Sequence, residues 1–262
     1  MNNSSSRDWT DIEGPLLVEQ SGDRSTTSRV LLHGFTQTCS SWNRYIGLVR
    51  PEQSIIRVDA PGHAGSSNVE ADLPTTATMV ATQCGHGDYI GYSMGARLAL
   101  HIALSQPHQV RRLVLVSGSP GLRTAKEQLA RSQSDEILAN EVGEIGVPKF
   151  VEKWLAATMF VGLTSTREEI QDRLRNTPEG LASSLRLSGT GTQESLWDQL
   201  KDLLMPVLLV VGAKDQKFHQ IGQEMKNAIG PNAHLAAIEN AGHSVHLEQT
   251  KEFYLVVEQF LQ

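Results

Sequence analysis

The stretch GYSMGAR, residues 91–97, joins an apolar run to a helical pattern and places a serine between two glycines. This G-x-S-x-G spacing between a strand and a helix is typical of a nucleophile elbow, a tight turn that lifts a serine hydroxyl out at a helix N-terminus. Side chains at Gly91 and Gly95 would clash in so tight a turn, which accounts for glycine at both positions. We therefore expect Ser93 to be a reactive residue.

Four other apolar runs also lead into loops: VLLHGF (30–35), SIIRVDAPGHAGS (54–66), RRLVLVSGSPG (111–121) and MPVLLVVGAKD (205–215). Nearly continuous Val, Ile and Leu runs indicate strands of a parallel sheet that is covered on both faces. Helical patterns such as 96–105 and 221–229 separate them. This alternation predicts an α/β fold with right-handed crossovers.

The alternation stops between about residues 122 and 200, where no clear strand is found. Amphipathic helical patterns occur there and just beyond, for example Leu196, Trp197, Leu200, Leu203 and Leu204. We interpret residues 1–121 and 201–262 as the α/β core and residues 122–200 as a helical lid over the carboxyl ends of the strands, where ligands bind in such sheets. The alternative is a helical layer packed on the side of the sheet.

A serine becomes reactive when an imidazole takes its proton and a carboxylate orients that imidazole. In this topology the chain order is serine, acid, histidine. His243, in ENAGHSVHLE after an expected strand, is the preferred base, and His246 is its rival. Asp215, in VVGAKDQKF, is the preferred acid. Asp59, which precedes the serine, is more plausibly a brace for its own turn.

Catalysis by a serine of this kind also needs two backbone N–H groups that stabilise a developing oxyanion. We expect them at Met94, directly after the serine, and at Phe35 in the HGF loop. His33 and Gly34 of that loop are interpreted as shaping it rather than as catalytic residues.

Three cations lie near these elements in sequence. Arg97 is on the same helix face as Ser93 and one turn later, and its side chain leans toward the helix N-terminus. Lys217 follows the acid by two residues, and Arg131 stands at the entry of the lid. Such a set suits a small substrate with several carboxylates.

Composition argues against several other classes of protein. The formal net charge of −6 argues against a broad nucleic-acid surface. No apolar run is long enough to cross a bilayer, and the polar start MNNSSSRDWT lacks the apolar core of a signal peptide. Cys39 and Cys84 are interpreted as unpaired thiols of a cytoplasmic protein, without a metal-type spacing. The sequence does not indicate an oligomeric state.

The ordered motifs resemble a known family over nearly the whole chain. HGF, DAPGHAGS, GYSMGAR, SPGL with Arg131 and Asp135 downstream, SGTGTQESLW, GAKDQKF and AGHSVHLE together resemble the 2-succinyl-6-hydroxy-2,4-cyclohexadiene-1-carboxylate synthases of menaquinone biosynthesis, which have the α/β-hydrolase fold. Three positions depart from the family pattern: Ala96 replaces a glycine, Ala60 a leucine, and KWLAATMF lacks a proline.

The resemblance implies an enzyme without a cofactor or metal that eliminates pyruvate from a tricarboxylate. It implies the triad Ser93, Asp215 and His243, with the serine as the base that abstracts a ring proton. Further implied substrate contacts are Tyr92, Arg97, Arg131, Trp154 and Lys217. Two alternatives remain at this point: a serine hydrolase that cleaves an ester or a carbon–carbon bond, and a non-catalytic binding protein of the same fold.

Overall fold

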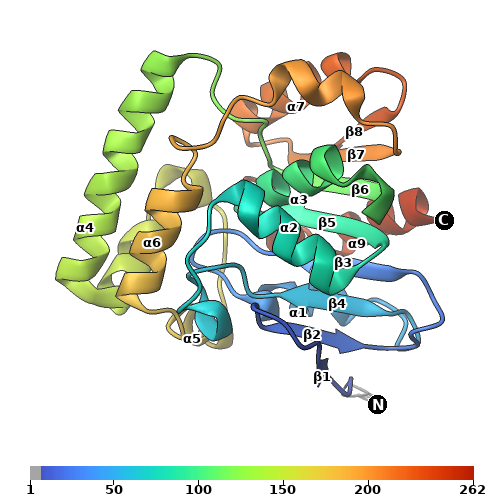
Figure 1. The fold of residues 1–262 in the computed structure, drawn as a ribbon, viewed down its shortest axis with the longest axis horizontal. Helices are drawn as coiled ribbons and strands as arrows, with labels where there is room; N and C mark the ends of the chain where they lie inside the picture. Colours follow the sequence, from blue (N-terminus) through green and yellow to red (C-terminus); the bar gives the residue numbers. More distant parts are fainter. Residues whose placement is uncertain (1–6) are drawn as a thin grey trace.

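A computed structural model describes residues 7–262 and shows an eight-stranded sheet flanked by helices (Figure 1). Residues 1–6, which hold part of the polar start, lie outside the described residues. The strand order is β1-β2-β4-β3-β5-β6-β7-β8; β1 and β2 pair antiparallel and all other neighbours pair in parallel. The strands are β1 (Thr10–Asp11), β2 (Val18–Ser21), β3 (Ser28–Leu32), β4 (Ile55–Val58), β5 (Gly87–Tyr92), β6 (Val110–Val116), β7 (Val207–Gly212) and β8 (Ala233–Ile238). The predicted, mostly parallel α/β sheet is confirmed.

Helices cover both faces of this sheet. One layer holds α2 (Leu73–Cys84), α3 (Met94–Ser105) and α7 (Gln216–Ile229), and the other holds α1 (Asn43–Ile46), α8 (Val245–Glu248) and α9 (Thr250–Leu261). Alternate residues of each strand serve the two layers: in β3, Val30 and Leu32 belong to the first core and Leu31 to the second. Burial on both faces explains why the strands read as continuous apolar runs.

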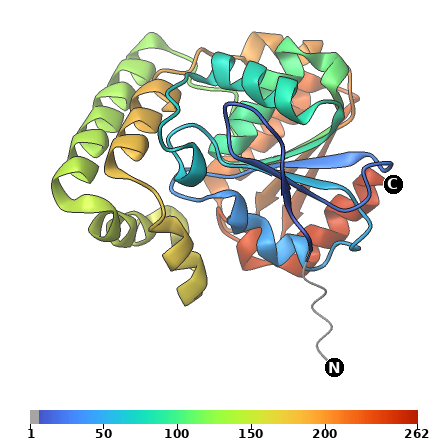
Figure 2. The same ribbon diagram turned by 60° about the horizontal axis from the view of Figure 1, so that its bottom comes forward.

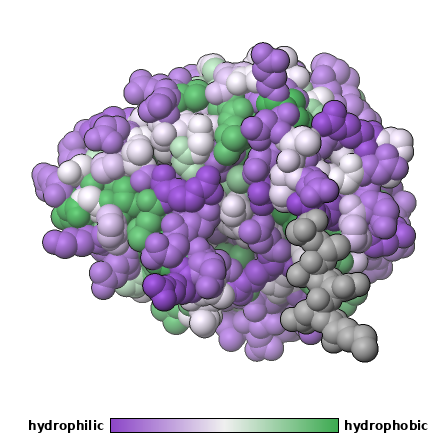
Figure 3. All heavy atoms as spheres, turned by 90° about the horizontal axis from the view of Figure 1, so that it is seen from below, coloured by the Kyte–Doolittle hydropathy of each residue, from purple (hydrophilic) through white to green (hydrophobic). Residues whose placement is uncertain are grey.

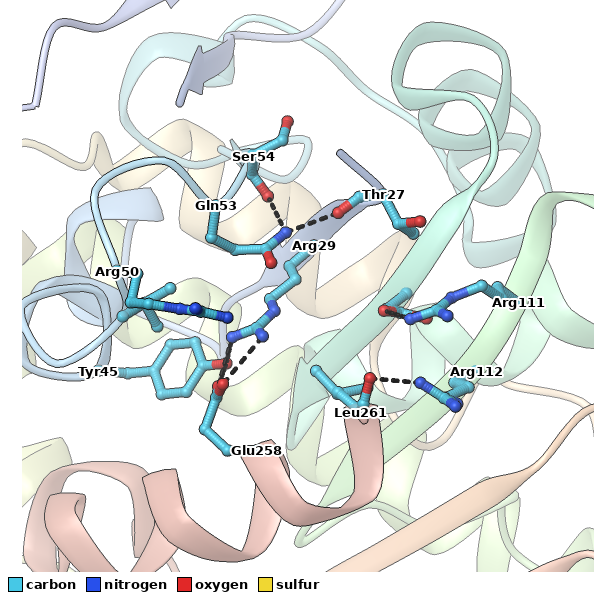
Figure 4. A network of polar contacts seen from close by, with 12 residues as sticks. Thr27, Arg29, Tyr45, Arg50, Gln53, Ser54, Arg111, Arg112, Glu258 and Leu261 are labelled. Carbon is cyan, nitrogen blue, oxygen red and sulfur yellow. Dashed lines mark hydrogen bonds and ion pairs between the residues drawn. The ribbon is translucent and has the colours of Figure 1, made fainter. Parts of the chain in front are cut away.

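Polar contacts at the amino ends of the strands attach α9 to the sheet (Figure 4). Arg29, at the start of β3, forms an ion pair with Glu258 of α9 and also donates to the Tyr45 hydroxyl at 3.0 Å. Arg112 of β6 donates to the carbonyl oxygen of Leu261. These contacts lie at the end of the sheet opposite Ser93, so they fix the second helical layer without entering the site.

The segment between β6 and β7 contains helices and no strand. Its main helices are α4 (Ala125–Leu155), α5 (Arg167–Arg173) and α6 (Pro178–Ser188). Helices α4 and α6 lie side by side, away from the layers on the sheet, and enclose a small core of their own (Figures 1 and 2). Helix α4 is kinked at Gly146, whose φ of 75° suits glycine, just before Pro148. We call α4, α5 and α6 the cap.

Two sequence expectations differ from the structure. The stretch 197–202 is a 3₁₀-helix, and Leu196, Leu200 and Leu203 join the core of the main domain, whereas Leu204 is 79% exposed. The expected amphipathic helix there is therefore wrong for Leu204. Strands β1 and β2 were not indicated, because TD and VEQS are short and mostly polar segments; β1 is the edge strand and β2 lies beside it.

The surface is mixed in character. The face shown in Figure 3 is mainly hydrophilic, with separate hydrophobic patches. Within the described part of the chain, no helix is both long enough and apolar enough to span a membrane.

Candidate active site

Ser93 lies in the turn between β5 and α3, with φ 51° and ψ −105°. This is a strained backbone for a non-glycine residue, and such strain is typical of functional turns. A Cβ at Gly91 would lie 2.2 Å from the carbonyl oxygen of Gly95, and a Cβ at Gly95 would lie 2.1 Å from that of Leu32. The two glycines are therefore required by close backbone contacts.

His243 and Asp215 complete a hydrogen-bonded chain with the serine. The Nε2 atom of His243 lies 3.1 Å from Ser93 Oγ, and its Nδ1 atom lies 2.9 Å from Asp215 Oδ2. The other carboxylate oxygen of Asp215 accepts from the N–H of Phe218 at 3.2 Å and caps α7. The His243 side chain is 1% exposed, and its carbonyl accepts from Ser117 Oγ at 2.8 Å. Both the ring and the backbone of the histidine are thus fixed.

The two rivals have other environments. His246 packs between the rings of Tyr92 and Trp42, with centroids 4.3 and 4.7 Å away, and neither of its ring nitrogens has a hydrogen-bond partner in residues 7–262. Asp59 is buried and accepts from the N–H groups of Cys39 (2.7 Å) and Gly65 (3.0 Å), so it braces its own turn. Neither residue reaches Ser93.

The expected oxyanion donors lie at the same place. Met94 is the first residue of α3, and Phe35 follows β3 and lines the cavity beside Ser93. Neither N–H has an acceptor among residues 7–262. His33 accepts from the N–H of Ala60 at its Nε2 atom (3.0 Å), so its Nδ1 carries the proton and donates to the Gly34 carbonyl (2.8 Å). The histidine therefore shapes the loop that carries Phe35.

A cavity of about 400 Å³ opens over Ser93 between the main domain and the cap. Its wall contains the four expected residues Arg97, Arg131, Trp154 and Lys217, together with Phe35 and Met94. Hydroxyl groups from α4, from α6 and from the turn after α6 add a polar surface: Ser134, Ser184, Ser188 and Thr190. The site thus combines a serine within hydrogen-bonding distance of a histidine with three cations.

The two arginines are held differently. Arg131 forms an ion pair with Asp135, one turn later on α4, at 2.7 Å. Arg97 is 8% exposed and donates to two neutral oxygens, Gln193 Oε1 at 3.0 Å and the Ser188 carbonyl at 2.7 Å. Burial, and then the charge of Arg131, lowers the pKa of Arg97 to about 10. Arg97 therefore stays charged at neutral pH.

Known proteins resemble this chain along most of its length. Residues 30–254 match a family model described as "Alpha/beta hydrolase family". A Bacillus subtilis (strain 168) protein named "Putative 2-succinyl-6-hydroxy-2,4-cyclohexadiene-1-carboxylate synthase" is 35% identical over 93% of both chains. The chain belongs to this synthase family of α/β-hydrolases. The Salmonella typhimurium (strain LT2) protein of the same synthase name is 29% identical, over 87% of this chain and 90% of its own. The solved structure of MenH from S. aureus has a TM-score of 0.86 and 29% identity, covering 93% of this chain and 97% of the other.

One residue expected from the synthase family lies apart from the large cavity. The Tyr92 hydroxyl bonds to Ser244 Oγ at 2.8 Å, and burial raises its pKa. Tyr92 instead lines a small cavity of about 20 Å³ that also borders on Ser93. Its ring also supports His243, with centroids 5.5 Å apart.

The same small cavity contains two polar residues that the sequence did not indicate. Arg173, at the end of α5, is buried, contacts Thr36 Oγ1, and has its pKa lowered by burial. Gln37 donates no hydrogen bond from its buried Nε2 atom to any residue from 7 to 262. No local sequence motif marks either residue. Arg173 lies in the same cavity as Ser93 because the cap folds back over the core.

Besides His243, four histidines are buried, and these four stay neutral; we call His33, His63, His101 and His246 the buried histidines. Burial is the main cause of their lowered pKa values, about 4 for His33 and His101 and about 3 for His63 and His246. His101 lies within α3. Among residues 7–262, no group of His, Cys, Asp or Glu is arranged to hold a metal ion.

Proposed function

We propose that this chain eliminates pyruvate from 2-succinyl-5-enolpyruvyl-6-hydroxy-3-cyclohexene-1-carboxylate and forms 2-succinyl-6-hydroxy-2,4-cyclohexadiene-1-carboxylate, a step of menaquinone biosynthesis. The observation that carries the proposal is the cavity over Ser93, whose wall contains Arg97, Arg131 and Lys217. These three cations match the three carboxylates of the proposed substrate. A small neutral ester would gain nothing from this set of cations. The named relatives support the same activity.

The bond changes are those of a 1,4-elimination. The ring C2 carries both a proton and the succinyl ketone, so removing this proton gives an enolate. The electron pair then forms the C2–C3 double bond, the C3–C4 double bond moves to C4–C5, and the C5–O bond breaks. The departing enolpyruvate takes a proton on its methylene carbon and becomes pyruvate. No oxidant, metal or water is consumed.

The residues have matching roles in this proposal. Ser93 Oγ takes the C2 proton while its own proton passes to His243 Nε2, 3.1 Å away. Asp215 keeps the opposite ring nitrogen protonated and stabilises the imidazolium. The N–H groups of Phe35 and Met94 stabilise the enolate oxygen. Arg97, Arg131 and Lys217 bind carboxylates, and Trp154 forms an apolar wall.

The proposal places the reaction in the cytoplasm, which accords with two free, buried cysteines, Cys39 and Cys84. The substrate is a small molecule, and the proposed chemistry needs neither nucleic acid nor a membrane.

The test is to supply the enolpyruvyl precursor and follow pyruvate through a coupled, NADH-dependent reduction. We expect pyruvate and the cyclohexadiene product in equal amounts, with no mass added to Ser93 during turnover. Ser93→Ala is the control and should abolish release. Absence of pyruvate, or an acyl adduct on Ser93 with rapid ester hydrolysis, would favour a hydrolase instead.

A further inference from the structure

Arg97 is a buried cation without an anionic partner. Its two acceptors are neutral, and no carboxylate among residues 7–262 forms an ion pair with it. Arg131, by contrast, is already paired with Asp135. An unpaired buried charge is costly unless a ligand supplies the missing counter-charge. Of the two arginines in the cavity wall, Arg97 is therefore the one whose positive charge is less compensated by the protein.

The acceptors of Arg97 are suited to orient it without neutralising it. Ser188 is the last residue of α6, so its carbonyl belongs to the partly negative end of that helix. Gln193 presents an amide oxygen at 3.0 Å. Together they fix two nitrogens of the guanidinium and leave its formal charge available.

The backbone of Gln193 is held by α4, and its side chain is buried, with no hydrogen-bond partner for Nε2 among residues 7–262. Gln193 is 4% exposed, and its carbonyl accepts from Gln128 Nε2 of α4 at 3.2 Å. The loop that carries it lies close against α4: a Cβ at Gly189 would lie 2.6 Å from Asp135 Oδ2, and one at Gly191 would lie 2.2 Å from the N atom of Ser132. This close packing explains the glycines of SGTGTQ, a stretch that the proposed chemistry does not otherwise use.

We propose that Gln193 is a positioning residue that orients Arg97 through a neutral acceptor, so that its full charge is reserved for a substrate carboxylate. Gln193 does not line the cavity and acts through Arg97. The inference rests on the proposed function in that it names how one carboxylate of that substrate is recognised. A purely structural role for Gln193 would depend on its shape and hydrogen bond, whereas this role depends on its lack of charge.

Two substitutions separate these roles. Gln193→Glu keeps the shape and the bond to Arg97 but adds a negative charge, while Gln193→Met removes the bond and adds no charge. If neutrality matters, Gln193→Glu is the more harmful change and should raise KM for the tricarboxylate roughly tenfold to a hundredfold, the range of one charge-assisted contact. Gln193→Met should raise KM only a few-fold, because Ser188 still holds the guanidinium. A structural role predicts the reverse order.

The experiment measures KM and kcat for pyruvate release in the wild type and both variants, and the Kd of succinate by calorimetry. Gln199→Glu, at an exposed position six residues later, is the matched control and should behave as wild type. We expect Gln193→Glu to weaken succinate binding by a similar factor, with kcat changed much less than KM.

A milder effect of Gln193→Glu than of Gln193→Met, a loss confined to kcat, or no succinate binding by the wild type would overturn the inference. Binding of succinate does not depend on turnover. If the wild type releases no pyruvate but succinate binding follows the expected order, the proposed function fails and the role of Gln193 stands.

Discussion

Gly95→Ala tests whether the close approach of the elbow to β3 determines the reactivity of Ser93. The new Cβ would lie 2.1 Å from the Leu32 carbonyl oxygen and 2.6 Å from that of His33, whereas real Cβ atoms stay beyond 3.0 Å. The start of α3 and the end of β3 must therefore separate by about 1 Å (3.0 minus 2.1). Both contacting atoms belong to the backbone, so no side-chain rotation relieves the clash.

This separation would open the proposed oxyanion hole, because Met94 is on one side of the gap and Phe35 on the other. A misplacement of about 1 Å costs on the order of a hundredfold in rate, so kcat/KM for pyruvate release should fall about that much. Strain of about 1–3 kcal/mol should also lower Tm by several degrees. KM should change less than kcat, since Arg131 belongs to the cap and the hydrogen bonds to Ser188 and Gln193 hold the guanidinium of Arg97 in place.

Gly143→Ala is the matched control. Gly143 lies within α4, and an added Cβ would meet no atom within 4 Å. This change should leave kcat unchanged and raise stability by about 0.5–1 kcal/mol, since alanine favours helix over glycine. Both variants are compared by steady-state kinetics and thermal unfolding. A Gly95→Ala enzyme with wild-type kcat and Tm would refute the reasoning.

Three further predictions follow from the site. In steady-state assays, His243→Ala and Ser93→Ala should each lower turnover by several orders of magnitude without unfolding the protein, whereas His246→Phe should retain its turnover. If the His246 variant lost turnover and the His243 variant kept it, the histidine assignment would be wrong. Arg97→Met and Arg131→Met should each lower kcat/KM for the tricarboxylate about tenfold to a hundredfold and leave hydrolysis of a neutral p-nitrophenyl ester unaffected; equal losses on both would contradict carboxylate binding. The buried histidines have folded pKa values below the unfolded value of about 6.5, so the unfolded state binds more protons as the pH drops from about 6.5 toward 4, and the free energy of unfolding falls. Urea unfolding should show a loss on the order of 1–2 kcal/mol per histidine between pH 7 and pH 5. Equal free energies of unfolding at the two pH values would refute this expectation.

Much of the main domain was predictable because its strands are buried on both faces. One apolar run, Val30, Leu31 and Leu32, lies where both helical layers pack on the sheet, so the continuous apolar pattern matches burial on both faces. The elbow was predictable for a similar reason, since its glycines are fixed by local backbone contacts. Strands β1 and β2 were not, because the edge strand β1 is only two exposed residues long and its neighbour β2 is only partly buried, so neither forms an apolar run.

The contacts between the cap and the core could be predicted from the sequence only in part. Arg97 could be placed from helix geometry alone, since it shares a helix with the serine. Arg173 could not, because its position depends on how α5 packs on the HGF loop, through contacts between residues more than a hundred positions apart. Tyr92 shows the complementary limit: its position beside Ser93 was evident, but its hydroxyl is directed to Ser244 by a contact made 152 residues later in the chain.

The attachment of α9 has a consequence for biosynthesis. Arg29 is made early and its partner Glu258 only 229 residues later, together with the side chains of Phe253, Val257 and Leu261 that cover one face of the sheet. While the ribosome is still translating the middle of the chain, β3 and β6 exist but their second covering layer does not. A nascent chain released before α9 would expose an apolar strand surface and a guanidinium without its counter-ion, and would be prone to aggregate. Translation of residues 250–261 therefore sets the moment at which the core can close.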